Sequence, residues 1–372
     1  MSAPAVGAAT AAVGGRLPRA LHPGAWWIWA LAMAAAASRT TDPLLLGLIL
    51  AVVAFVVTNR RTDAPWARGF RGYLILAGIV IAVRVVFRML LDAEYGATIL
   101  FTLPEFELPE AAAGISLGGP VSLEGLLAAL YDGLRLATML VCIGAAQALA
   151  NPKRLLRAVP GALHEAGTAV VVALSVAPQL VTSVGRVRRA RRLRGAPGRG
   201  LGALRAILIP VLEDALERSM ALAAAMDSRG YGRVGSAPAS ERRTTGVLIV
   251  GGLLGVCVGL YGLLDGTAPP WFGLPLFFAG TAIAVGGLLL GGRSAQRTVH
   301  RPDPWTGEEW AVAVSGVVAA GTLFWASTVD VTLMNPSLSP VTWPTFAVGP
   351  SLGILVGLAP AWLAPPPPVV VR

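Results

Sequence analysis

The sequence predicts an all-α polytopic membrane protein, and its composition, its apolar runs and the placement of its charges each support that fold. Of the 372 residues, 55% are hydrophobic and only 13% are charged. Several apolar runs have the length of about 20 residues that a helix needs to cross a bilayer. Because so few charges cannot cover the surface of a soluble protein of this size, we expect the chain to be embedded in a membrane.

Eight apolar runs are the predicted membrane spans, so we expect about eight transmembrane helices. They lie at about residues 25–37, 43–57, 73–91, 123–149, 246–264, 272–291, 310–328 and 346–363. We divide the chain into an N-terminal membrane region of about four spans (1–149), a cytoplasmic helical region (150–235) and a C-terminal membrane region of about four spans (236–372). The first two runs are short for a hydrocarbon core of about 30 Å, which predicts tilted or flank-extended helices.

The connections between these runs alternate between basic and acidic. Arginines crowd the connections near residues 60–71, 153–157, 186–243 and 293–301, whereas acidic residues occupy those near 92–110, 265 and 330. Because basic residues are retained in cytoplasmic loops, the alternation predicts that both termini are cytoplasmic. The same arginines account for the formal net charge of +10, so we expect no nucleic-acid partner.

Residues 162–184 interrupt the alternation, because this moderately apolar run lies between two basic segments. A full crossing would place one basic segment outside the cell, which is unfavourable. We therefore expect a long helix that does not cross the membrane and that continues into GRVRRARRLRG. Residues 201–229 have apolar positions at helical spacing and a charged opposite face, which predicts a second long helix.

Two segments, ARRLRGAPG (190–198) and AMDSRGYG (225–232), share the pattern Ala-x-x-x-Arg-Gly, and their arginines lie 35 residues apart. Glycine readily adopts the left-handed conformation that ends many helices, and an arginine in the last turn interacts favourably with the helix dipole. An ordinary capped helix end explains either copy alone, whereas two matched copies favour a paired docking surface. The candidate docking residues are Ala190, Arg194, Gly195, Ala225, Arg229 and Gly230.

These motifs resemble those of the transmembrane T component of energy-coupling factor transporters. The resemblance also rests on LHPGAWWIWALAMAAAASRTTDPLLL near the N-terminus and on VSLEGLLAALYDGLRLATMLV at the fourth predicted span. It covers about residues 20–235 and extends more loosely beyond. Two features depart from the family: the first motif is unusually dense in arginine, and four predicted spans follow the second motif, where many members have fewer.

The resemblance implies a non-catalytic transporter subunit in the plasma membrane of a bacterium. Arg194 and Arg229 would each dock into a groove on one of two ABC-type ATPase subunits. A membrane-embedded substrate-binding S component would bind a vitamin or a metal ion and reorient when the ATPases act.

The residues themselves argue against two kinds of site. The only lysine, Lys153, lies in NPKRLLR, so the sequence has no Walker-type phosphate-binding loop, and any coupling to ATP must come from a partner. Three isolated histidines, His22, His164 and His300, have no Cys or carboxylate beside them at metal-ligand spacing. We therefore expect neither a cofactor nor a metal.

Four charged residues at predicted spans are candidates for contacts between spans or with the S component: Arg84, Glu124, Asp132 and Arg135. An unpaired charge at the bilayer centre costs at least about 2.5 kcal/mol on insertion scales. We expect Arg84 to pair with an acid of the fourth span, in which Asp132 and Arg135 share a helix face. A purely structural ion pair is the alternative.

Two other classes of function stay open. A stand-alone secondary transporter would need broken helices at matching positions of two repeats, and we find no such repeat. An integral membrane enzyme would need clustered carboxylates near an interface, for which Asp303, Glu308 and Glu309 are the nearest candidates. Their segment, with Trp305 and Trp310, is more typical of an interfacial anchor before a span.

Overall fold

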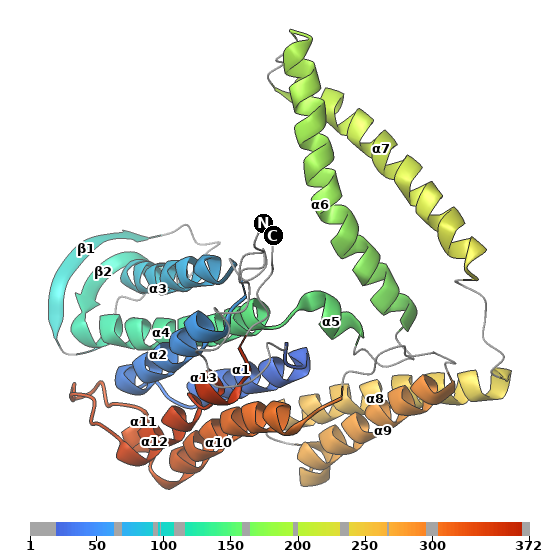
Figure 1. Cartoon of the computed structure of the whole chain (residues 1–372). Coiled ribbons are helices and arrows are strands. Elements are labelled where there is room, and N and C mark those ends of the chain that lie inside the picture. The colour runs from blue at the N-terminus through green and yellow to red at the C-terminus, as the bar shows by residue number, and fades with distance from the viewer. Residues whose placement is uncertain are drawn as a thin grey trace, which may run out of the picture. The chain divides into compact units, whose positions relative to one another are not determined.

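A computed structural model describes residues 20–62, 69–91, 96, 98–107, 116–157, 164–195, 200–230, 238–265, 268–294 and 304–366 (Figure 1). The chain forms two compact units, which are considered separately below. The first joins Met1–Leu155 with Asp303–Arg372, and the second is Leu156–Pro302. The two units do not test the three regions predicted from the sequence, because the first unit combines parts of the N-terminal and C-terminal membrane regions. Those three regions stay a prediction.

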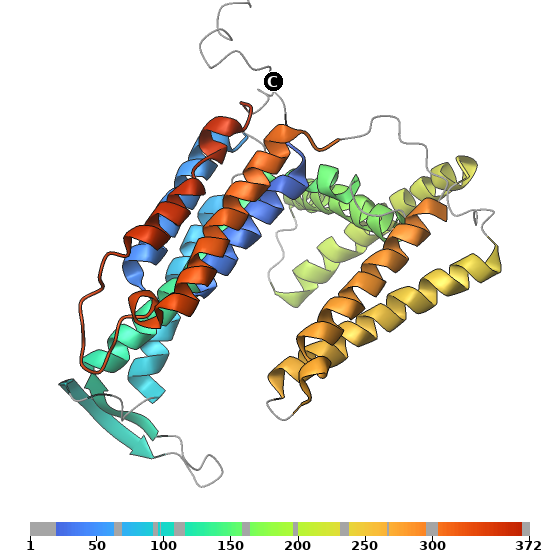
Figure 2. The same cartoon turned by 90° about the horizontal axis from the view of Figure 1, so that it is seen from below.

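Helices from the two ends of the chain build the first unit together. Its N-terminal helices are α1 (Pro23–Ser38), α2 (Pro43–Arg60), α3 (Phe70–Leu91) and α4 (Leu123–Leu149). Its C-terminal helices are α10 (Gly307–Val329), α11 (Val331–Met334), α12 (Val348–Val356) and α13 (Pro360–Leu363). Helix α1 packs against α4 and α10, and α2 packs against α4, α12 and α13, so that blue and red helices lie side by side in Figure 2.

The core of the first unit is formed by side chains of α1, α2, α4 and α10. Trp29, Met33, Ile49 and Leu323 are completely buried there. The indole Nε1 of Trp29 donates a hydrogen bond to the carbonyl of Gly357 at 3.1 Å, which links α1 to the C-terminal segment. Buried indoles usually have such a partner, because an unpaired N–H in an apolar environment is costly.

The carboxylate of Glu309, which the sequence analysis considered as a candidate for an enzyme site, caps the start of α10. Glu309 is completely buried and forms a capping box with Thr306. Its Oε1 atom also accepts the backbone N–H of His22 at 3.2 Å, immediately before α1. Glu309 therefore satisfies backbone donors at the starts of two helices, as an N-terminal acid can.

A two-stranded hairpin in the first unit was not predicted. Strands β1 (Ile99–Glu107) and β2 (Ser116–Ser122) pair antiparallel between α3 and α4. The sequence segment ILFTLPEFE contains β-branched and aromatic residues that favour a strand, but it is too short and too charged to count as a membrane span. Assigning elements by apolar run length overlooked it for that reason.

The second unit contains a helical hairpin and a pair of long helices, after the short helix α5 (Pro152–Arg157), which straddles the unit boundary. The hairpin consists of α8 (Ala239–Leu264), the short 3-10 helix η4 (Pro270–Phe272) and α9 (Leu274–Ser294). Its helices approach so closely that a Cβ atom at Gly252 or Gly280 would collide with backbone of the facing helix. Small residues at such positions are typical of helix pairs within membranes.

Six of the described helices are long and apolar enough to cross a membrane: α2, α3, α4, α8, α9 with its preceding turn, and α10. The sequence predicted about eight spans, in approximate agreement. The two remaining predicted spans are shorter helices, because α1 has 16 residues and Val348–Leu363 is divided between α12 and α13. The prediction of an all-α multi-pass membrane protein is confirmed.

Candidate functional site

Two long helices carry the Ala-x-x-x-Arg-Gly motifs. Helix α6 (His164–Leu193) has 30 residues and continues without a break from the moderately apolar segment into the arginine-rich one. Helix α7 (Leu201–Ser228) has 28 residues. At 1.5 Å per residue each helix is about 45 Å long or slightly less. Both predicted helices are confirmed, and neither is among the six described helices that could cross a membrane.

Each motif ends its helix in the predicted way. Gly195 has φ +68° and Gly230 has φ +77°, in the left-handed region that favours glycine. The N–H of Gly195 donates to the carbonyl of Arg192 at 3.2 Å, and the N–H of Gly230 donates to that of Asp227 at 2.9 Å. These bonds satisfy carbonyls that a helix end leaves unpaired, as in a Schellman cap.

The motif arginines stand at the exposed ends of their helices. Arg194 and Arg229 are each the first residue beyond the helix, and both are exposed, as are Ala190 and Ala225 one turn back. The two local structures therefore match, although the residues between alanine and arginine differ. We call the segments 186–195 and 221–230 the α6 tip and the α7 tip.

The two tips lie far apart. The α6 tip is adjacent to the beginning of α7, whereas the α7 tip is at the other end of that helix (Figure 1). The length of α7 is about 42 Å, and the six residues between Arg194 and Leu201 can span at most about 24 Å. The two motif arginines are thus separated by roughly 18 Å or more, which is too far for one small groove to hold both.

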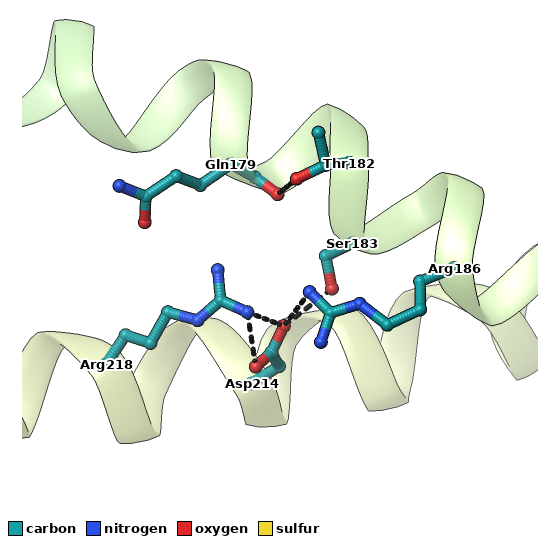
Figure 3. A network of polar contacts seen from close by, with 6 residues as sticks. All are labelled: Gln179, Thr182, Ser183, Arg186, Asp214 and Arg218. Atoms are coloured by element: carbon teal, nitrogen blue, oxygen red, sulfur yellow. Dashed lines mark hydrogen bonds and ion pairs between the residues drawn. The ribbon is translucent and has the colours of Figure 1, made fainter.

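A polar contact holds the point where α6 and α7 cross (Figure 3). The hydroxyl of Ser183 on α6 donates to Oδ2 of Asp214 on α7 at 2.6 Å. Arg218, one turn further along α7, contacts both oxygens of that carboxylate at 2.6 and 2.8 Å. Arg186 of α6 approaches the same carboxylate at 3.9 Å. We call these four residues the crossing cluster.

The crossing cluster also has an electrostatic signature. The hydrogen bond from Ser183 and the charges of Arg218 and Arg186 hold the pKa of Asp214 below its usual range, because they stabilise the ionised form. Ser183 is 2% exposed and Val211 is 8% exposed, whereas Leu212 and Leu216 of α7 are largely exposed. A small buried contact around one carboxylate therefore joins two otherwise exposed helices.

The sequence alone does not link the four residues of the crossing cluster. The spacing of Asp214 and Arg218 is a recognisable i,i+4 signal on a helix. Ser183, which lies 31 residues before Asp214, gives no comparable local signal.

The charged residues at the spans divide into two groups. Arg84 of α3 and Asp132 of α4 form an ion pair at 3.4 Å, and Arg135 lies 3.8 Å from Asp132. Glu124 is buried at the start of α4, where it accepts the backbone N–H of Thr98 at 3.1 Å. Eight residues of helix, about 12 Å, separate Glu124 from Asp132. Asp132, rather than Glu124, is thus the acid that pairs with Arg84.

Within the described part of the chain, no group of three His, Cys, Asp or Glu side chains could hold a metal ion. In the described part of the second unit, the candidate functional groups are the exposed arginines at the ends of α6 and α7.

The fold and these helix ends define a class: a multi-pass membrane protein with two further long helices that end in exposed arginines. Residues 14–238 match the family model of the cobalt transport protein, CbiQ. That range includes both motifs and more than half of the chain, so the chain belongs to this family, the T components of energy-coupling factor transporters. No curated protein matches the chain. The hairpin α8–α9 and the C-terminal helices lie beyond the matched range.

Proposed function

We propose that this chain couples two ABC-type ATPase subunits to a membrane-embedded S component during uptake of a vitamin or a metal ion. The observation that carries the proposal is the pair of capped, exposed arginines, Arg194 and Arg229, at the separated ends of two crossing helices. The family supports a role in membrane transport. Docking to ATPases and to an S component is our inference.

The geometry suits such coupling for two reasons. Each tip exposes an arginine whose planar, permanently charged group can form several hydrogen bonds in a groove. The crossing cluster joins the two helices, so that a displacement of one tip is transmitted to the other helix. In this proposal the tips lie on the cytoplasmic side, where ATP is available, and both termini lie on the same side.

The α3–α4 surface supports contact with a second membrane protein. Arg84 and Asp132 have side chains 51% and 38% exposed, although they belong to helices that can cross a membrane. Large apolar side chains of the same helix α3, including Ile79, Val83 and Phe87, are also exposed. Because a charge facing lipid is unfavourable, we propose that the S component covers this ion pair.

The decisive experiment is purification of the tagged full chain from its native membrane, followed by identification of the subunits that accompany it. We expect an ATP-binding-cassette protein and a small membrane protein. If no ATPase accompanies the intact chain, the proposed function is wrong.

The double variant Arg194→Ala/Arg229→Ala tests the docking residues in the same assay. This variant should insert normally into the membrane but should no longer co-purify with the ATPase subunits. In a separate transport assay it should no longer support substrate uptake. Arg242→Ala/Arg243→Ala is the matched control, since it removes two exposed arginines from α8, outside both tips. Equal retention of the ATPases by both variants would contradict the docking role.

A further inference from the structure

The two tips have the same cap but opposite surroundings. The α6 tip, RVRRARRLRG, contains six arginines and no acid, whereas the α7 tip, ALAAAMDSRG, contains one arginine and one aspartate. Both tips gain the same favourable interaction between a terminal cation and the helix dipole. The dipole therefore does not account for the additional arginines of the α6 tip.

Three of these arginines form a surface of their own. Arg188, Arg189 and Arg192 are exposed, and their spacing of three and four residues places them on one face of α6. Like charges at this spacing repel one another and disfavour the helix, unless an acidic surface neutralises them. The equivalent positions of α7, in register with its motif, are Ala223, Ala224 and Asp227. We call the three arginines the arginine face.

An apolar side chain accompanies the arginine face. Leu193, immediately before the motif arginine, is 89% exposed. Its equivalent in α7 is Ser228, whose hydroxyl donates to the carbonyl of Ala225 at 2.9 Å within its own helix. The α6 tip thus presents a leucine and a dense positive charge, while the α7 tip presents mostly small side chains and one charge of each sign.

We propose that the α6 tip binds an ATPase surface whose groove is lined by acidic side chains, and that the arginine face, together with Arg194, supplies the attraction. The α7 tip binds its groove without such an electrostatic contribution. This inference rests on the proposed function, because it concerns the partner of the same docking site. Any groove that receives Arg194 must lie against the arginine face, which occupies the two turns before it.

The experiment compares the affinity of full-length variants in detergent for the ATPase subunits that co-purify with the intact chain. Arg188→Ala/Arg189→Ala/Arg192→Ala, which keeps Arg194, should bind about tenfold to a hundredfold more weakly at low salt, as expected for the loss of three exposed charge pairs. Raising the ionic strength from about 0.1 M to about 1 M shortens the Debye length from about 10 Å to about 3 Å. That change should strongly weaken ATPase binding by the intact chain and should weaken ATPase binding by the triple variant only slightly.

Two controls separate the arginine face from general positive charge. Arg242→Ala/Arg243→Ala removes exposed arginines from the beginning of α8 in the same unit and should keep the salt dependence of the intact chain. Arg229→Ala should lower the affinity but change the salt dependence much less than the triple variant does, because it removes one charge rather than three.

The outcomes are distinguishable. If the intact chain binds no ATPase, the proposed function itself fails and this inference fails with it. If the intact chain binds ATPase, but the triple variant has the same affinity and salt dependence, only the acidic groove is excluded. If the triple variant keeps its ATPase affinity and instead loses binding to vesicles of anionic lipid, the arginine face contacts the membrane surface and the inference is wrong.

Discussion

The bundle of α1, α2, α4 and α10 and the pair α6–α7 are both helical, yet they are stabilised in different ways. In the bundle, side chains such as Trp29, Ile49 and Leu323 are completely buried between helices. In the pair, the crossing has only a small buried contact, and long stretches of both helices are exposed. The bundle can therefore keep its arrangement by packing, whereas the pair depends on one polar cluster and on the partners that we propose.

The largest expected effect concerns the core of the bundle. Trp29→Ala removes a fully buried indole and its hydrogen bond to Gly357, so it should lower the free energy of unfolding by about 3 kcal/mol or more. Trp325→Ala is the matched control, because Trp325 of α10 is 69% exposed. Denaturant unfolding in detergent measures both variants. Equal losses would show that Trp29 is not a core residue.

The next effect concerns the carboxylate that joins the starts of α1 and α10. Glu309→Ala removes the acceptor for the N–H groups of His22 and Thr306, so two partly buried donors lose their partner at a cost of about 1–3 kcal/mol. Glu308→Ala, at the adjacent and less buried position, should cost less. The same unfolding assay distinguishes them, and a larger loss for Glu308→Ala would contradict the capping role.

A smaller effect concerns the helix tips. Gly195→Ala places a side chain on a backbone with φ +68°, which costs about 1 kcal/mol without any steric contact, since no atom lies within 4 Å of the added Cβ. We expect faster amide hydrogen exchange in the last turn of α6 and little change in global unfolding. Gly185→Ala, within the same helix, should show no such change.

The crossing cluster should affect the geometry of the pair more than its stability. Asp214→Asn removes the charge that Arg186 and Arg218 contact, so the angle between α6 and α7 should become variable. Spin labels at Val171 and Met220 report that angle as a distance distribution. The distribution should broaden in the Asn variant and stay narrow in Glu217→Gln, which changes the same charge one turn along α7. A narrow distribution in both would contradict a role for Asp214.

The same labels test the pH dependence. The pKa of Asp214 is held below its usual value of 3.8, so its ionised form stabilises the crossing above that value. That stabilisation is lost only as the pH falls through the lowered pKa. The distance distribution of the intact chain should therefore be constant from neutral to mildly acidic pH and should broaden in strong acid. Broadening already near pH 6 would assign the change to another group.

Local features of the sequence determined much of this protein. The long uninterrupted helix α6, the glycine caps at Gly195 and Gly230, and the apolar spans all follow from short-range rules on charge, hydropathy and backbone conformation. These rules operate within a few residues, so one sequence is sufficient to apply them. The hairpin β1–β2 was missed because its short strands carry no span-length signal.

Only the tertiary structure decided which distant residues meet. The link from His22 to Glu309 spans 287 positions, and the link from Ser183 to Asp214 spans 31. The tertiary structure also decided that Asp132, rather than Glu124, is the acid beside Arg84. Which turn of α4 faces α3 depends on how the two helices pack. Such choices depend on the packing of whole helices against one another, which periodicity along the chain does not encode.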